Sequence, residues 1–343
     1  MNNSFDDTAF TAADVARTAR LISPHIVRTP LLHSAAGPWG TAYLKCENLQ
    51  HTNSFKFRGA ISAVLHYQAE GGLLWRRIIR DGVVTCSSGN FGRAVARIAD
   101  ELGFACTVVV PDSMPDVKLQ AMLTANPGVQ VAKVPYAEWR RIITTSEYPA
   151  SRSLFLSSET NHRVSLGNAT IAAEILRDLS DVDAVLVPYG GGNLAYSIAS
   201  YLRAAGRRTP VYAVEMTTGA PFAGSLRAGR PTDVEYLPSF VDGIGATFVI
   251  PAQFHRVRDL LAGSLLVSPD EVAESVSSLA FHDKIVVEGA GAAAPAAAAR
   301  YAREYGWKKP CAVVSGGVIE PSLLLDTLRT SRGDAQTTAR STA

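Results

Sequence analysis

Apolar and polar positions along the chain follow two patterns that alternate. Short apolar runs rich in valine occur at 83–87, 106–111, 129–135, 183–188, 210–216 and 311–317. Between them stand longer stretches such as FGRAVARIADELG (91–103) and NLAYSIASYLRAAG (193–206), in which the apolar positions are spaced as on one face of a helix. Continuous apolar strands separated by helices are typical of parallel sheets that are covered on both faces. The pattern therefore predicts an α/β fold.

The order of the elements predicts two lobes, each with a mostly parallel sheet flanked by helices. We expect residues 1–72 and 160–330 to form a large domain and residues 73–159 a small one, with the chain crossing at 71–82 and 151–162. The sequence SPDE (268–271) is a capping box with proline at the first helical position, so a helix should run from there to about Phe281. Residues 331–343 lack an apolar period and are predicted to be disordered.

Composition limits the classes of function. The chain has 343 residues, 47% of them apolar and 19% charged, with a net charge of +2. Because no basic run is interleaved with aromatic residues, nucleic acid is not an expected partner. The N-terminus lacks the basic and apolar regions of a signal peptide, and no apolar run is long enough to span a membrane, so we expect a cytoplasmic protein without a membrane partner. Four scattered cysteines indicate reduced thiols rather than a metal cluster.

The turn after the run at 183–188 contains Gly190, Gly191 and Gly192 and leads into a helix near Asn193. Backbone N–H groups of a glycine-rich turn can converge on an anion, and the positive end of the helix dipole favours negative charge there. The turn matches neither GxxxxGK[ST] nor GxGxxG. We interpret it as a phosphate cradle, with a plain flexible turn as the alternative.

Two further turns carry small polar residues. In TCSSGNFGRA (85–94), Ser87, Ser88 and Asn90 stand at the start of a helix and could bind a carboxylate or a phenolate oxygen, although ordinary capping needs only one such residue. In AVVSGGV (312–318), Ser315 follows an apolar strand, where its hydroxyl could bond a ring nitrogen.

Lys56 stands between two phenylalanines in SFKFRGA (54–60). An unpaired lysine among apolar rings would have a lowered pKa and a neutral, nucleophilic amine, the form that joins carbonyl compounds or pyridoxal phosphate (PLP). The alternative is an amphipathic stretch in which Lys56 and Arg58 extend past packed rings towards water.

Together, SFKFRGA, SSGN, GGGN, VVEGAGAAA (286–294) and SGGV, in this order, resemble the fold type II PLP enzymes, in particular the serine/threonine dehydratase and serine racemase branch. The resemblance covers about residues 20–325 and implies PLP as cofactor, a small amino acid as substrate and a homodimer. It implies that Lys56 is the Schiff-base lysine and that Ser88 is a second acid/base on the opposite face. The cofactor would contact Phe55, Lys56, Asn90, Gly190, Gly191, Gly192, Asn193, Leu194, Glu288 and Ser315. The substrate would contact Ser87, Ser88, Gly89, Asn90 and Phe91.

The resemblance implies β-elimination of an amino acid such as L-threonine or L-serine to a 2-keto acid and ammonia. An amino-acid racemase and a β-replacement synthase remain alternatives, because departures from the family motifs gather on the expected substrate side: Phe91, Asn193, Gly289 and the stretches SSETNHR (157–163) and SLGNAT (165–170). Glu215 matches the first ligand of the racemase cation site, but a later carboxylate position falls near Pro221, so we expect no metal.

Overall fold

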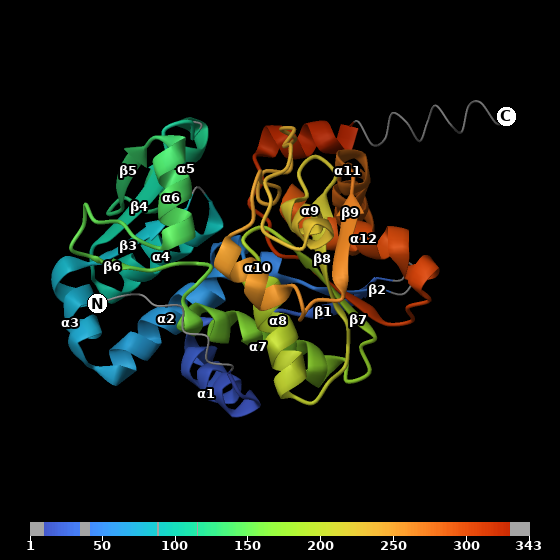
Figure 1. Cartoon of the computed structure of the whole chain (residues 1–343), viewed down its shortest axis with the longest axis horizontal. Helices are drawn as coiled ribbons and strands as arrows, with labels where there is room; N and C mark the ends of the chain where they lie inside the picture. Colours follow the sequence, from blue (N-terminus) through green and yellow to red (C-terminus); the bar gives the residue numbers. More distant parts are fainter. Residues whose placement is uncertain (1–9, 35–41, 88, 115, 330–343) are drawn as a thin grey trace.

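Two sheets lying side by side form the framework of the protein (Figure 1). The computed structural model describes residues 10–34, 42–87, 89–114 and 116–329. The larger sheet has six strands in the order β1-β2-β10-β7-β8-β9, and all of its neighbouring pairs are parallel except β1 and β2. Its strands are β1 (Leu31–Ser34), β2 (Ala42–Lys45), β7 (Ala184–Pro188), β8 (Val211–Met216), β9 (Gly263–Val267) and β10 (Pro310–Val313).

The smaller sheet has four parallel strands in the order β5-β4-β3-β6. They are β3 (Val83–Cys86), β4 (Cys106–Pro111), β5 (Gln130–Val134) and β6 (Leu154–Phe155). Helices α4 (Asn90–Leu102), α5 (Asp116–Ala125) and α6 (Tyr136–Thr145) connect them. Every strand and connecting helix of this sheet lies between residues 83 and 155, as one lobe (Figure 1).

The remaining helices cover the sheets and the surface between them. Helix α2 (Lys56–Glu70) packs against both α4 and α7 (His162–Asp178), so it joins the two sheets. The others are α1 (Ala12–Ile22), α3 (Leu73–Asp81), α8 (Asn193–Ala204), α9 (Pro221–Ala228), α10 (Pro251–Val257), α11 (Pro269–Ser278) and α12 (Gly289–Tyr305). A further helix occupies 321–329, and short helical turns lie at Ser23–His25, Glu47–Leu49, His51–Asn53 and Leu279–Asp283.

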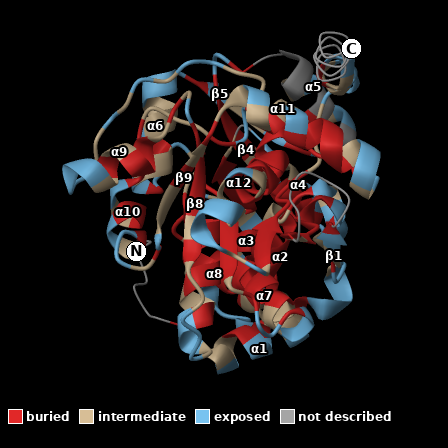
Figure 2. Cartoon of the chain, turned by 90° about the vertical axis from the view of Figure 1, so that its right-hand side faces the viewer, coloured by how far each residue is buried: buried red, intermediate tan, exposed pale blue. Residues whose placement is uncertain are grey.

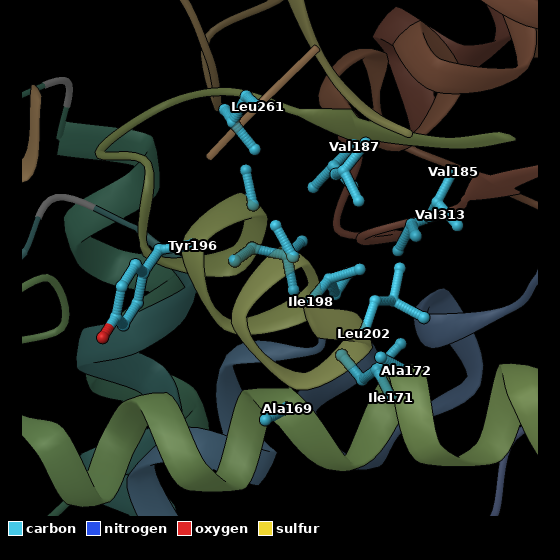
Figure 3. Packing of buried hydrophobic residues seen from close by; sticks show 14 of the residues in the cluster. Ala169, Ile171, Ala172, Val185, Val187, Tyr196, Ile198, Leu202, Leu261 and Val313 are labelled. Atoms are coloured by element: carbon cyan, nitrogen blue, oxygen red, sulfur yellow. The ribbon is translucent and has the colours of Figure 1, made fainter. Parts of the chain in front are cut away.

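The core that positions the site lies between β7 and helices α7 and α8. Figure 3 shows Ala169 and Ala172 of α7 beneath Ile198 and Leu202 of α8, with Val187 of β7 above them. Central strands and helices are almost entirely buried, whereas the outer helices carry exposed faces (Figure 2). Burial of aliphatic side chains stabilises by about 1.5–3 kcal/mol each, so the junction between β7 and α8 is held firmly.

The fold class predicted from the sequence is confirmed, and each of the six apolar runs overlaps one of the strands β3, β4, β5, β7, β8 and β10. The capping box is also confirmed, since the Ser268 hydroxyl accepts from the Glu271 N–H and the Glu271 carboxylate accepts from the Ser268 N–H.

Two boundaries were predicted wrongly, and four strands were not identified. The last apolar run is a strand only as far as Val313, because the chain then turns so that Gly316 bridges to Ser54. The helix that begins at Pro269 ends at Ser278 and continues as a wider turn to Asp283. The sequence analysis did not identify β1, β2, β6 or β9. The predicted disordered tail lies outside the described residues.

Candidate functional site

A cavity of about 780 Å³ opens where the carboxyl ends of both sheets face each other. In parallel sheets, the turns after the strands gather at this edge, which is where ligands bind. The cavity is lined by all described residues that the sequence analysis selected for the cofactor and the substrate: Phe55, Lys56, Ser87, Gly89, Asn90, Phe91, Gly190, Gly191, Gly192, Asn193, Leu194, Glu288 and Ser315. Ser88 lies outside the described residues.

Lys56 is the first residue of α2, and its side chain is 22% exposed. Its Nζ lies 5.1 Å from the centre of the ring of its sequence neighbour Phe55 and 5.9 Å from that of Phe91, which comes from α4. The expectation of an unpaired amine was wrong, because Nζ donates to the Glu159 carboxylate at 3.1 Å. Phe57 does not surround the amine either, since its side chain is buried in the core beside α4.

Arg58 fixes the start of α2 through buried ion pairs. Its side chain is fully buried, so the alternative in which it extends to water was wrong. It bonds both oxygens of Glu47, at 2.8 and 2.9 Å, and both oxygens of Glu174, at 2.7 and 2.9 Å. Burial alone would lower the pKa of Arg58, but these carboxylates outweigh burial and raise it. The charged network fixes the turn of helix that carries Lys56, because removing one partner would leave a buried charge uncompensated.

The glycine turn has the geometry of an anion cradle. Helix α8 begins at Asn193, directly after Gly192, whose φ of +91° lies in the left-handed region that favours glycine. A Cβ added at Gly191 would lie 2.2 Å from Cδ of Glu159. The Asn193 N–H donates to Glu159 Oε2 at 3.3 Å. A carboxylate therefore already stands on this turn, in a position that suits a phosphate oxygen.

Glu159 is the important residue that the sequence analysis did not identify. Its carboxylate links Lys56 to the glycine turn and also accepts from the Ser158 hydroxyl at 2.8 Å. Burial raises the pKa of Glu159, but the Lys56 charge and the hydrogen bonds from Ser158, Lys56 and Asn193 outweigh burial and hold the pKa below its ordinary value. The stretch SSETNHR showed only a departure from the family motif, and nothing in it indicated that the side chain reaches the glycine turn.

The polar side chains opposite the glycine turn form a second group. Asn90 Nδ2 donates to Glu288 Oε1 at 2.9 Å, and the Val318 N–H donates to Glu288 Oε2 at 3.2 Å. Ser315 is nearly buried, and its hydroxyl has one long contact of 3.4 Å with the Ala290 carbonyl. A Cβ at Gly316 would overlap the Glu288 carboxylate, so only glycine lets the chain pass this close.

The turn after β3 contributes Ser87 and Gly89 to the cavity wall. The Gly89 N–H donates to the Ser87 hydroxyl at 3.3 Å, and both residues line the cavity. The Phe91 side chain is almost fully buried and packs into the core of the small lobe. Cys86 also lines the cavity, but burial raises the pKa of its thiol to about 12, so it is not a nucleophile at neutral pH.

Glu215 stabilises the start of α9 by hydrogen bonds. Its oxygens accept from the N–H groups of Phe222 and Ala223, both at 2.8 Å, and from the Ser264 hydroxyl at 2.6 Å. Among the described residues, no cluster of three or more His, Cys, Asp or Glu side chains could hold a metal ion. The described helices include none long and apolar enough to cross a membrane.

Comparison with known proteins matches residues 22–317 to the family model described as "Pyridoxal-phosphate dependent enzyme". The chain is 31% identical over 320 residues to an L-threonine ammonia-lyase of Thermotoga maritima, covering 92% of this chain and 77% of that protein. Among solved structures, a serine racemase of Dictyostelium discoideum is 27% identical with a TM-score of 0.77, covering 91% of this chain and 100% of the other. A PLP-dependent aspartate racemase is 28% identical with a TM-score of 0.76, covering 94% and 98%.

Proposed function

Because the chain belongs to the family of pyridoxal-phosphate dependent enzymes, we propose that it deaminates a β-hydroxy amino acid such as L-threonine or L-serine by β-elimination. The protein is a PLP enzyme of the ammonia-lyase type. The single observation that carries the proposal is that one carboxylate bridges Lys56 Nζ and the glycine turn, at 3.1 and 3.3 Å. The Lys56 amine and the glycine turn that would bind an anion are thus separated by a single carboxylate group.

The residues of the cavity fit PLP. The backbone N–H groups of Gly190–Gly192, Asn193 and Leu194 would hold the phosphate, since the turn already accommodates an anion and a Cβ at Gly191 would fill it. Lys56 would hold the cofactor covalently. Phe55, Asn90, Glu288 and Ser315 would border its ring.

When bound, PLP supplies an aldehyde that joins to amines and a conjugated ring that takes up electron density from Cα. Lys56 removes the Cα proton, because it is the one amine among the described residues that line the cavity and stands at the start of a firmly anchored helix. The turn at Ser87 and Gly89 binds the substrate carboxylate through small donors. Overall, one water leaves at Cβ and one is consumed when ammonia is released.

Ser315 favours elimination over transamination. A serine hydroxyl is a weak acid, so it would hydrogen-bond a ring nitrogen of PLP without protonating it fully. The ring would then draw in less negative charge from the substrate, which would favour prompt loss of the group on Cβ. Ser315 is almost completely buried, which would strengthen such a hydrogen bond.

The test is incubation of the PLP-loaded enzyme with a panel of amino acids, with 2-keto acid, ammonia and the enantiomer of the substrate measured together. We expect keto acid and ammonia in equal amounts from L-threonine or L-serine, and neither from Lys56→Ala. A D-amino acid without keto acid would establish a racemase instead. An adduct formed only with an added nucleophile would establish a β-replacement synthase.

We further propose that the enzyme is a cytoplasmic homodimer with no nucleic-acid or membrane partner. The small net charge of +2 supports the absence of a nucleic-acid partner. Light scattering of the purified protein measures the oligomeric state, and a monomer at micromolar concentration would contradict the homodimer.

A further inference from the structure

The wall of the cavity on the side of the small sheet carries one positive charge among its described residues. Its described lining residues there are Cys86, Ser87, Gly89, Asn90, Phe91, Arg93, Pro111, Ser113, Met114, Met122, Tyr136, Trp139 and Ile143. Arg93 is the only one of them with a charged side chain, and none is acidic. A cation set in a largely apolar wall attracts a negatively charged group more strongly than the same cation in water would.

Two donors in this wall have no partner. Arg93 Nε is buried and makes no hydrogen bond, and the same holds for Trp139 Nε1. A buried donor without an acceptor is unfavourable, so two such donors in one cavity wall point to a ligand that supplies the acceptor. Burial lowers the pKa of Arg93, and only Glu288 acts in the other direction. The two Glu288 oxygens already accept from Asn90 and Val318.

Both donors flank the turn that follows β3. Arg93 lies in the first turn of α4, three residues after Asn90. Trp139 lies on α6, and its main-chain carbonyl is 3.9 Å from Sγ of Cys86, the last residue of β3. Ser87 and Gly89, which we place at the substrate carboxylate, stand between Cys86 and Arg93 in the chain. A group on the substrate Cβ that extends towards the small sheet would therefore meet Arg93 and Trp139.

We propose that Arg93, with Trp139, determines specificity for a substrate that carries a negatively charged group on Cβ, such as 3-hydroxyaspartate or O-phosphoserine. This inference rests on the proposed elimination. From 3-hydroxyaspartate, the Cα proton and the Cβ hydroxyl leave as water, and hydrolysis then gives oxaloacetate and ammonia. From O-phosphoserine, phosphate leaves in place of hydroxide, and one water is consumed to give pyruvate and ammonia.

The experiment compares kcat/KM for 3-hydroxyaspartate, O-phosphoserine, L-threonine and L-serine in the wild type and in Arg93→Gln, Arg93→Lys and Trp139→Phe. The matched control is Arg97→Gln, since Arg97 lies on the same helix but is exposed and pairs with Glu101. We expect at least a tenfold preference of the wild type for one of the anionic substrates. Arg93→Gln should remove most of that preference, Arg93→Lys should keep part of it, and Trp139→Phe should reduce it a few-fold.

Calorimetric binding of succinate, compared with butyrate, gives a readout that does not require turnover. Arg93→Gln should weaken succinate binding by at least tenfold and butyrate binding much less. If serine and threonine are deaminated without a preference for either anionic substrate, or Arg93→Gln affects all four substrates alike, the inference is overturned and the proposed elimination stands. If no amino acid is deaminated, the elimination fails, and the succinate measurement alone decides whether Arg93 binds an anion.

Discussion

Replacing Glu159 with glutamine should tighten the binding of PLP. In the structure, the Glu159 carboxylate accepts from the Asn193 N–H of the glycine turn and pairs with Lys56, with its side chain only 10% exposed. The PLP phosphate needs the same N–H groups, and its covalent link needs the same amine. Cofactor binding must therefore displace the carboxylate and leave a negative charge near the phosphate. Glutamine has the same shape without the charge.

The magnitude follows from these contacts. Hydrogen bonds to charged groups contribute about 1.5–3 kcal/mol each, and two unit charges 4 Å apart interact by about 4 kcal/mol at an effective dielectric of 20. Because the displaced carboxylate can turn away from the phosphate, we expect about 1.4–3 kcal/mol of the total to appear as affinity. Since each 1.4 kcal/mol is a factor of ten, Glu159→Gln should bind PLP roughly ten- to a hundredfold more tightly.

The assay titrates protein freed of cofactor with PLP and follows both the visible absorbance and the quenching of tryptophan fluorescence. Inorganic phosphate, used as a competitor, reports on the cradle without the covalent step. The control is Glu304→Gln, because Glu304 is exposed on α12 and is not among the residues that line the cavity. Unchanged or weaker PLP binding by Glu159→Gln would refute the competition between this carboxylate and the phosphate.

The same carboxylate should also stabilise the protein freed of cofactor in a pH-dependent way. Because the folded pKa of Glu159 is below its ordinary value of 4.5, the unfolded chain binds more protons over the interval between the two values. The stabilisation is therefore present above the ordinary pKa and is lost as pH falls through the folded pKa. The melting temperatures of wild type and Glu159→Gln should differ most at neutral pH and converge in acid; a constant difference would contradict this assignment.

Four further outcomes are expected. Lys56→Ala should fold normally but lose covalent cofactor, so borohydride should fix no PLP label; retention of normal turnover would refute its role. Gly191→Val should weaken PLP binding by well over tenfold, since a side chain there would obstruct the phosphate; unchanged affinity would reject the cradle. Ser88→Ala should suppress any L-to-D conversion while sparing deamination of the L-substrate; equal losses, with a stability cost of about 1 kcal/mol, would indicate a helix cap. Treatment with EDTA should leave activity intact, because the Glu215 oxygens are bonded to Phe222, Ala223 and Ser264; loss restored by a divalent cation would contradict this.

Local patterns in the sequence were sufficient for the fold class and for the three turns whose glycine and small polar residues line the cavity. Apolar runs predict strands because burial on both faces of a parallel sheet demands them, and the capping box at Ser268 is a contact between residues three positions apart. Three successive glycines, followed by a helix, similarly specify a turn that exposes N–H groups. These features depend on neighbours in the chain, so the sequence alone determined them.

Which charged and polar side chains of the site pair with one another was decided by the tertiary structure. Glu159 reaches Lys56, 103 positions away, because the turn before α7 lies against the start of α2. The pairs Arg58–Glu174 and Asn90–Glu288 likewise join residues 116 and 198 positions apart. Whether Lys56 is paired, and whether Arg93 and Trp139 lack acceptors, depends on which side chains packing brings within about 3 Å. No local pattern encodes these distances, because two sheets must first form and face each other.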